Sequence, residues 1–167
     1  PINKSKILHG GINIVDSNVI IIDMTIEKSN SEDAINIISS RSFIKNLKLK
    51  EITEDAIDID FGELIFENIE CKNISNDCLD VSGASINGKS FQATNIGDKG
   101  ISFGENSIGN IQNSNFINNK LAIAVKDGSK LSLSKYNLEN NKYDIAVFNK
   151  KKEYEGSTLN LNDIENK

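Results

Sequence analysis

The chain is built on a repeating pattern of apolar and polar positions. A small residue, an Ile or Leu, a variable residue and then Val, Ile or Phe recur, as in Ala56-Ile57-Asp58-Ile59 and Cys78-Leu79-Asp80-Val81. The aliphatic anchors are 23 residues apart once and 22 residues apart five times: Ile12, Ile35, Ile57, Leu79, Ile101, Ile123 and Ile145. A fixed period in this range is typical of solenoid proteins.

Between the anchors, apolar residues alternate with polar ones in short runs. After Ile57 the apolar positions are Leu64 and Phe66, then Ile69 and Cys71. This alternation indicates half-buried β-strands, and no stretch has a convincing helical period. The sequence therefore predicts an all-β fold, a single-stranded parallel β-helix of about seven 22-residue coils with three short strands per coil. We expect the coil to be right-handed, because connections between parallel strands are right-handed in nearly all folds.

Asparagines recur at matching places just before each coil closes: Asn73, Asn95, Asn118 and Asn140. Asn tolerates the left-handed backbone conformation that such corners need, and its side chain can bond to the next Asn in the stack. We therefore interpret these residues as part of the architecture.

The whole chain, 1–167, is expected to form one β-helix domain. Residues 1–10 would supply a partial first coil, and residues 150–167 a polar tail or terminal coil. The charge run at 150–153 is expected to be a loop or lid, and no amphipathic helix is apparent as a cap. The chain begins at Pro1 without Met, so we expect a segment of a longer protein with neighbouring domains.

Composition narrows the classes of function. The formal net charge of −5 argues against a nucleic-acid-binding surface. No run of about 18 apolar residues is present, so no membrane span is expected. Of the two cysteines, alternation along the strand points Cys71 inward and Cys78 outward, and both are expected to be free thiols.

Charged residues gather on the outward positions of the middle coils. The first outward position after the anchor holds, in coil order, Asn13, Asn36, Asp58, Asp80, Ser102, Ala124 and Ala146. The second holds Val15, Ile38, Asp60, Ser82, Gly104, Lys126 and Phe148. The corner before the strand holds Asp33, Asp55, Asp77, Lys99, Leu121 and Tyr143.

Like charges on adjacent strands repel one another, so such a cluster calls for an explanation. One explanation is a bound Ca²⁺, which takes several carboxylate oxygens, with Asp58, Asp60 and Asp80 as the expected metal ligands. The other is an ordinary solvated acidic surface. If the surface binds a ligand, the expected contacts are Asp77, Asp80, Ser82, Asp98, Ser102 and Glu105. The candidate catalytic bases beside them are Lys99 and Lys126.

The coils and their Asn-rich corners resemble the right-handed β-helix proteins of the pectate-lyase superfamily. Asn76-Asp77-Cys78-Leu79-Asp80 is similar to the Asn-Thr-Asp-Gly-Ile-Asp stretch of polygalacturonase-type hydrolases. Asp98-Lys99-Gly100-Ile101 falls where that family carries an Asp-Asp pair, with Lys99 in place of the second Asp. Lys120-Leu121-Ala122 replaces the family's Gly-His-Gly, and the single histidine, His9, is far away in the sequence. Hydrolysis by two carboxylic acids is therefore not expected.

The resemblance also implies a lyase chemistry. In the polysaccharide lyases of this superfamily, Ca²⁺ neutralises a uronate carboxylate and a basic side chain removes the proton at C5. Lys99 or Lys126 would be that base here if its pKa were lowered. The acidic neighbours work against such a lowering.

Three functions follow from these observations. The favoured one is a non-catalytic β-helix module of a larger surface or secreted protein, which binds glycan or acts as a spacer. The alternative is a polysaccharide lyase or epimerase that acts on an acidic glycan with Ca²⁺. A further alternative is an adhesin or fibre segment. The near-minimal coils favour the module, whose expected location is extracellular, on the cell surface or in the periplasm.

Overall fold

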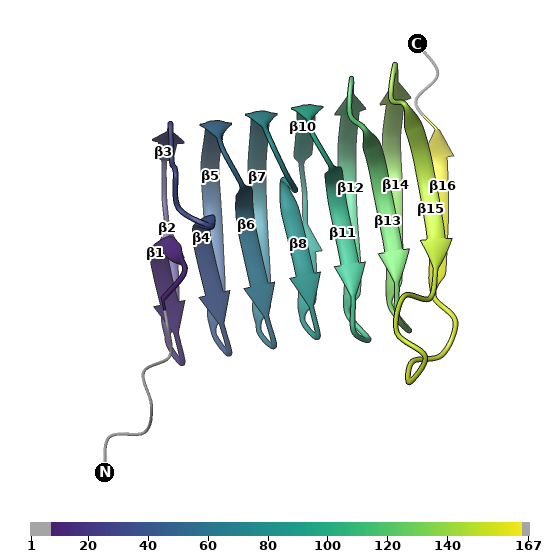
Figure 1. Ribbon diagram of the computed structural model, residues 1–167, viewed down its shortest axis with the longest axis horizontal. Helices are drawn as coiled ribbons and strands as arrows, with labels where there is room; N and C mark the ends of the chain where they lie inside the picture. The colour runs from purple at the N-terminus through teal and green to yellow at the C-terminus, as the bar shows by residue number, and fades with distance from the viewer. Residues whose placement is uncertain (1–7, 165–167) are drawn as a thin grey trace.

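The computed structural model describes residues 8–164, which form sixteen β-strands and no helix. All strand pairs are parallel. A seven-stranded sheet contains β1 (Gly10–Val15), β4 (Asp33–Ile38), β6 (Asp55–Asp60), β8 (Leu79–Ser82), β11 (Lys99–Gly104), β13 (Leu121–Lys126) and β15 (Tyr143–Phe148), in that order. It is the front layer of Figure 1.

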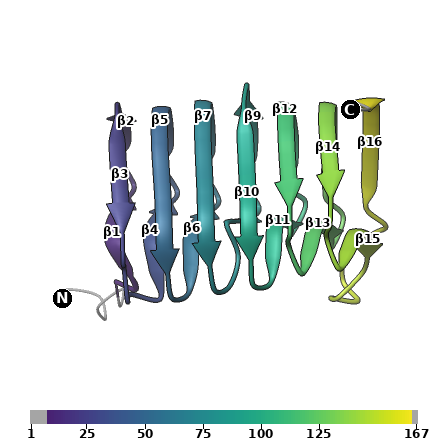
Figure 2. The same cartoon turned by 90° about the horizontal axis from the view of Figure 1, so that it is seen from above.

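The second sheet lies behind the first (Figures 1 and 2). Its order is β16 (Thr158–Ile164), β14 (Lys130–Glu139), β12 (Ile108–Ile117), β10 (Phe91–Ile96), β7 (Glu63–Ile74), β5 (Arg41–Ile52) and β2 (Asn18–Ile21). Two short strands complete it: β3 (Met24–Glu27) pairs with β5, and β9 (Ser85–Gly88) pairs with β7 and β12. The predicted second and third strands of a coil are therefore joined in most coils into one long strand.

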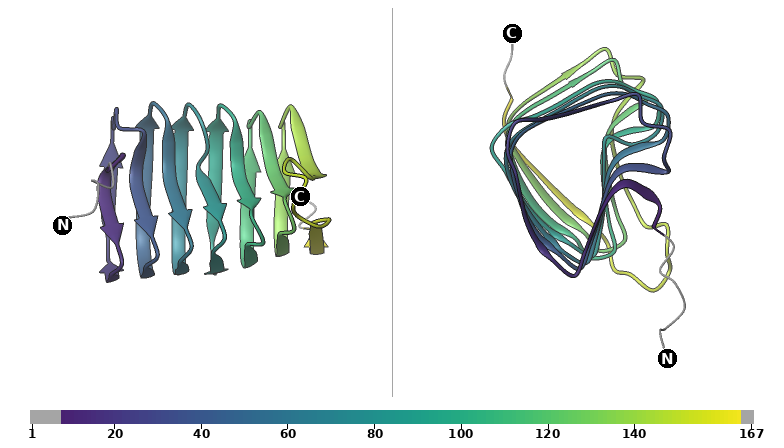
Figure 3. Two further views of the ribbon diagram at one scale, coloured as in Figure 1. Left: turned by 60° about the horizontal axis from the view of Figure 1, so that its bottom comes forward. Right: turned by 90° about the vertical axis from the view of Figure 1, so that its left-hand side faces the viewer.

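The chain winds as a right-handed parallel β-helix. In Figure 1 it runs down the front sheet and up the rear sheet while it advances from left to right. Seven strands in the front sheet correspond to about six complete turns, close to the seven coils expected. Viewed along the axis, the coils nearly superimpose (Figure 3). The predicted fold class is confirmed.

The predicted aliphatic ladder forms the core. Ile57 pairs with Leu79 and Leu79 with Ile101 on successive strands, and all three side chains are fully buried. A second stack uses aromatic rings: the centroid of Phe91 lies 6.2 Å from that of Phe66 and 5.8 Å from that of Phe116. Stacking of equivalent side chains follows directly from the constant repeat length.

The asparagine corners also form as expected. Asn73, Asn95, Asn118 and Asn140 have φ angles of 58°, 58°, 57° and 54°. The side-chain amide of Asn95 donates to Oδ1 of Asn73 over 2.9 Å. One position further on, Asn119 lies inside the coil, where its Oδ1 accepts a hydrogen bond from the backbone N–H of Ile96.

The prediction of two free thiols is wrong. Cys71 and Cys78 are both fully buried and form a disulfide with a Cα–Cα distance of 6.0 Å. Cys78 lies at the corner before β8, which begins at Leu79, and alternation does not hold at this position of the repeat. The residue before the anchor is buried in neighbouring coils too, as Ala56 and Ala122 show.

The disulfide should contribute about 2–3 kcal/mol to the free energy of unfolding, because it closes a short loop in the unfolded chain. Urea unfolding with and without a reductant would measure this loss. The Cys71→Ala/Cys78→Ala double variant is the control and should not respond to the reductant. An equal unfolding midpoint of the wild type in both conditions would contradict the prediction.

The last coil leaves apolar core positions uncovered. Ile145 and Val147 continue the inward ladder of β15, yet they are 39% and 46% exposed. Residues 149–157 form the expected charged loop, which lies outside the coil outline (Figure 3). The backbone N–H groups of Lys150 and Lys151 each donate to Oδ1 of buried Asp127 over 2.7 Å, which pins the loop to the preceding coil.

At the N-terminal end, β1 begins at Gly10, and most of the partial coil expected at 1–10 lies outside the described residues. The described part of the chain has no helix long and apolar enough to cross a membrane.

Candidate functional site

The predicted charged columns lie side by side on the outer surface of the seven-stranded sheet. Asn36 is in register with Asp58, Asp58 with Asp80, and Asp80 with Ser102. We call this surface the acidic face and define it by Asp33, Asn36, Asp55, Asp58, Asp60, Asp77, Asp80, Asp98, Lys99, Ser102 and Lys126. The register puts one polar group on each of several adjacent strands, about 4.8 Å apart along the helix axis.

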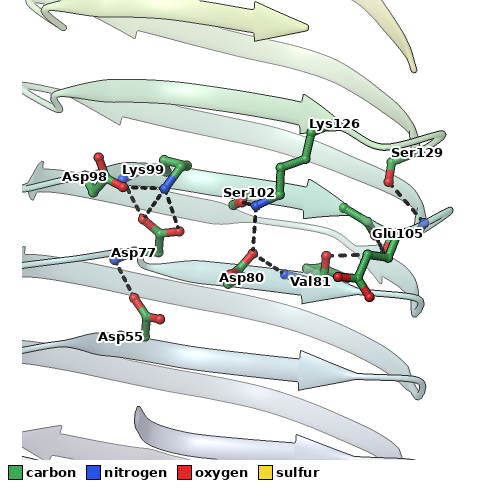
Figure 4. A network of polar contacts seen from close by, with 12 residues as sticks. Asp55, Asp77, Asp80, Val81, Asp98, Lys99, Ser102, Glu105, Lys126 and Ser129 are labelled. Carbon is green, nitrogen blue, oxygen red and sulfur yellow. Dashed lines mark hydrogen bonds and ion pairs between the residues drawn. The ribbon is translucent and has the colours of Figure 1, made fainter. Parts of the chain in front are cut away.

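Lys99 joins two carboxylates at the corner of the acidic face. Its Nζ lies 3.2 Å from both carboxylate oxygens of Asp77 and also forms an ion pair with Asp98. Asp98 accepts a second hydrogen bond from Nζ of Lys120 over 2.8 Å. These contacts form one continuous network across three coils, and Figure 4 shows its Asp77, Asp98 and Lys99 side chains.

Carboxylates also hold the backbone at this corner. Oδ1 of Asp55 accepts the backbone N–H of Asp77 over 2.8 Å, and Oδ1 of Asp77 accepts that of Lys99 over 2.9 Å. The same arrangement therefore repeats from one coil to the next (Figure 4). It places Asp77 almost entirely out of solvent.

A second group forms around Lys126. Its Nζ donates to Oγ of Ser102 over 2.9 Å and lies 3.9 Å from Oδ1 of Asp80. The same Asp80 oxygen accepts the backbone N–H of Val81. Ser102 is fully buried, because the Lys126 side chain lies over it (Figure 4).

Burial and mutual repulsion raise the pKa values of several carboxyl groups of the acidic face. Burial, together with the charges of Asp60, Asp33 and Asp80, raises the pKa of Asp58 to about 8. Burial raises the pKa of Asp77 to about 7, although Lys99 opposes the shift. Burial likewise raises the pKa of Asp55 to about 6. Asp58 has the highest of these pKa values and is therefore the group that carries a proton near neutral pH.

The pKa values of Asp98 and Lys99 are shifted so that each group keeps its charge. Burial acts to raise the pKa of Asp98, but hydrogen bonds from Lys120 and Lys99 outweigh it and the pKa is lowered. Burial acts to lower the pKa of Lys99, but Asp98 and Asp77 outweigh it and the pKa is raised. Lys99 is therefore a cation at neutral pH, which argues against a role as a free-amine base.

The structure brings the predicted residues together in two groups. Asp77, Asp98 and Lys99 form the first, and Asp80, Ser102 and Lys126 the second. Ser82 is half-buried and in register with Asp60 and Gly104. Glu105 belongs to neither group and pairs with Lys151 of the loop.

The proposed Ca²⁺ ligands Asp58, Asp60 and Asp80 lie on β6 and β8 of this face. Among residues 8–164, no group of three or more His, Cys, Asp or Glu side chains is placed so that it could hold a metal ion. Lys99 and Lys126 offset part of the negative charge of the face.

Sequence reasoning missed two members of the network, Asp55 and Lys120. Lys120 follows Asp98 by 22 residues, one repeat, and this spacing was a usable signal. Comparison with known protein families, curated proteins and solved structures finds no match.

Proposed function

We propose that this protein is a non-catalytic β-helix module that binds a glycan along its acidic face. The observation that carries the proposal is the row of partly exposed carboxyl and ammonium groups on β6, β8, β11 and β13, namely Asp58, Asp60, Asp80, Lys99 and Lys126. An extended oligosaccharide aligned with the helix axis would meet one or more of these groups at each of the four strands.

The chemistry of the face suits sugar hydroxyl groups, which both donate and accept hydrogen bonds. A carboxylate accepts, and a protonated carboxylic acid also donates. With a pKa of about 8, the partly exposed Asp58 provides the second form near neutral pH. The excess of carboxyl groups over lysines disfavours a polyanionic glycan, so the proposed ligand is neutral.

The buried Cys71–Cys78 disulfide supports a surface or secreted location, because disulfides persist in oxidising compartments. The β-helix fold itself is in keeping with a relation to the pectate-lyase-like proteins, in which a solenoid presents a long polar surface. The raised pKa of Lys99 speaks against the lyase alternative.

Titration calorimetry with cellohexaose, xylohexaose, mannohexaose, chitohexaose and hexagalacturonate would test the proposal. We expect one of the neutral sugars to bind and hexagalacturonate to bind more weakly or not at all. Asp80→Ala should weaken the binding by about tenfold or more, because a hydrogen bond to a charged group is lost. Glu70→Ala, on the second sheet, is the matched control and should bind like the wild type.

Two results would overturn the proposal. One is the absence of binding to every oligosaccharide. The other is the release of unsaturated products from hexagalacturonate, which would identify a lyase.

A further inference from the structure

Phe61 is an unusual residue at the end of the acidic face. It directly follows β6 and occupies the corner position four residues after the anchor, where the other coils before the last carry Asp16, Ser39, Gly83, Glu105 and Asp127. All six residues have positive φ, with 53° at Phe61. Small and polar residues tolerate this conformation best, and a bulky aromatic residue there is strained.

Folding gains little from this side chain, because Phe61 is 63% exposed. An apolar ring left in water contributes little burial to offset the backbone strain. Burial therefore does not explain why an aromatic residue occupies this corner. Residues with a strained backbone conformation are found mainly at functional sites such as ligand-binding sites.

The next coil holds the ring in place. A Cβ atom built on Gly83 would lie 2.7 Å from Cδ1 and 2.9 Å from Cε1 of Phe61. The ring therefore lies against the Gly83 backbone, in space that any other side chain would occupy. This support from the C-terminal side orients the ring before a ligand arrives, which lowers the entropic cost of binding.

A groove of about 510 Å³ lies on the other side of Phe61. Its size is within the range of small-molecule sites. It is lined by Asp16, Ser17, Asn18, Ser39, Ser40, Arg41, Phe61, Gly62 and Glu63. Phe61 is thus the single aromatic residue in a lining that is otherwise polar or small.

Some polar side chains that line the groove form hydrogen bonds within the protein, and others do not. Ser40 Oγ accepts the backbone N–H of Ser17 and donates to the carbonyl of Ile38. Arg41 Nε donates to Glu63 Oε2 over 2.6 Å, so the two charges offset each other. The side chains of Asn18 and Ser39 make no hydrogen bond to another residue within 8–164, and these groups remain for a ligand.

We propose that this groove is a subsite for one pyranose ring of a neutral glycan, with Phe61 as the stacking platform; the inference rests on the proposed function. The C–H face of the sugar packs on the aromatic ring. The hydroxyl groups at its rim reach Asn18, Ser39 and Arg41. An apolar ligand would find one apolar side chain here, and an anion would find Arg41 already paired with Glu63.

The test compares three variants with the same four neutral hexasaccharides. Phe61→Asn removes the ring while Asn accepts positive φ, so its unfolding midpoint should equal or exceed that of the wild type. Its affinity should fall by about tenfold or more, as for an aromatic anchor. The matched control is Ile108→Asn, which changes an exposed apolar residue on the second sheet and should bind like the wild type.

The third variant provides an independent signal. The chain contains no Trp, so Phe61→Trp places a single fluorophore at the groove, and its emission should change as the sugar saturates. If the wild type binds a sugar but Phe61→Asn binds equally well, or the emission stays constant at saturation, the subsite is wrong and the proposed function stands. If the wild type binds none of the sugars, both are wrong.

Discussion

The protein should unfold at a higher urea concentration at pH 5 than at pH 9. In the folded protein the pKa values of Asp58, Asp77 and Asp55 are about 8, 7 and 6, against ordinary values near 3.8. Between about pH 4 and about pH 8, the folded state therefore binds more protons than the unfolded state. The resulting stabilisation is complete below about pH 4 and is lost as the pH rises through 6 to 8. We expect a loss on the order of several kcal/mol.

Asp98 and Lys99 contribute little to the change in stability between pH 5 and pH 9. The lowered pKa of Asp98 stabilises the folded state above its ordinary pKa, and this effect is lost only at more acidic pH. The raised pKa of Lys99 stabilises the folded state until the pH exceeds the ordinary value of 10.5. Measurements between pH 5 and pH 9 therefore report mainly on the carboxyl groups with raised pKa values, which also include Asp33 and Asp60.

Asp58→Asn is the diagnostic variant, because asparagine resembles the protonated acid and cannot ionise. It should be more stable than the wild type at pH 9 and should show a smaller dependence on pH. Glu70→Gln, on β7 of the second sheet, should keep the wild-type dependence. A wild type that gains stability from pH 5 to pH 9 would refute the expected shifts.

Phe91→Ala should lower the free energy of unfolding by about 3–5 kcal/mol. The ring is fully buried and lies between those of Phe66 and Phe116, so its removal leaves a cavity in the middle of the stack. Neighbouring coils cannot collapse into this space, because their backbones are held in register by the parallel ladder. Urea denaturation at one fixed pH would measure the loss.

Phe148→Ala is the matched control for this experiment. Phe148 is in the last front strand, β15, and is exposed, so its truncation should cost less than about 1 kcal/mol. A loss below about 1 kcal/mol for Phe91→Ala itself would show that the aromatic stack is not part of the core.

The repeat pattern was sufficient to predict most of the fold. A constant repeat of 22 residues keeps equivalent residues in register, so the Ile57–Leu79–Ile101 ladder followed from the sequence. Side chains alternate along a strand, so the outward column of Asp58, Asp80 and Ser102 followed as well. These properties depend on position in the repeat and need no knowledge of the rest of the molecule.

Other properties arose only in the tertiary structure, and each has a physical reason. Alternation ends where a strand ends, so the direction of Cys78 and its bond to Cys71 depended on the path of the corner. Lysine side chains are long and flexible, so the choice of Asp77 and Asp98 as partners of Lys99 depended on local packing.

The properties that bear on function depended most on the three-dimensional arrangement. The raised pKa of Asp58 depends first on burial, which is a property of the assembled face. The position of the Phe61 ring depends on a corner with positive φ and on Gly83, which leaves room for the ring one coil later. The repeat placed these residues in adjacent coils, but contact between the coils made the charged surface and the groove.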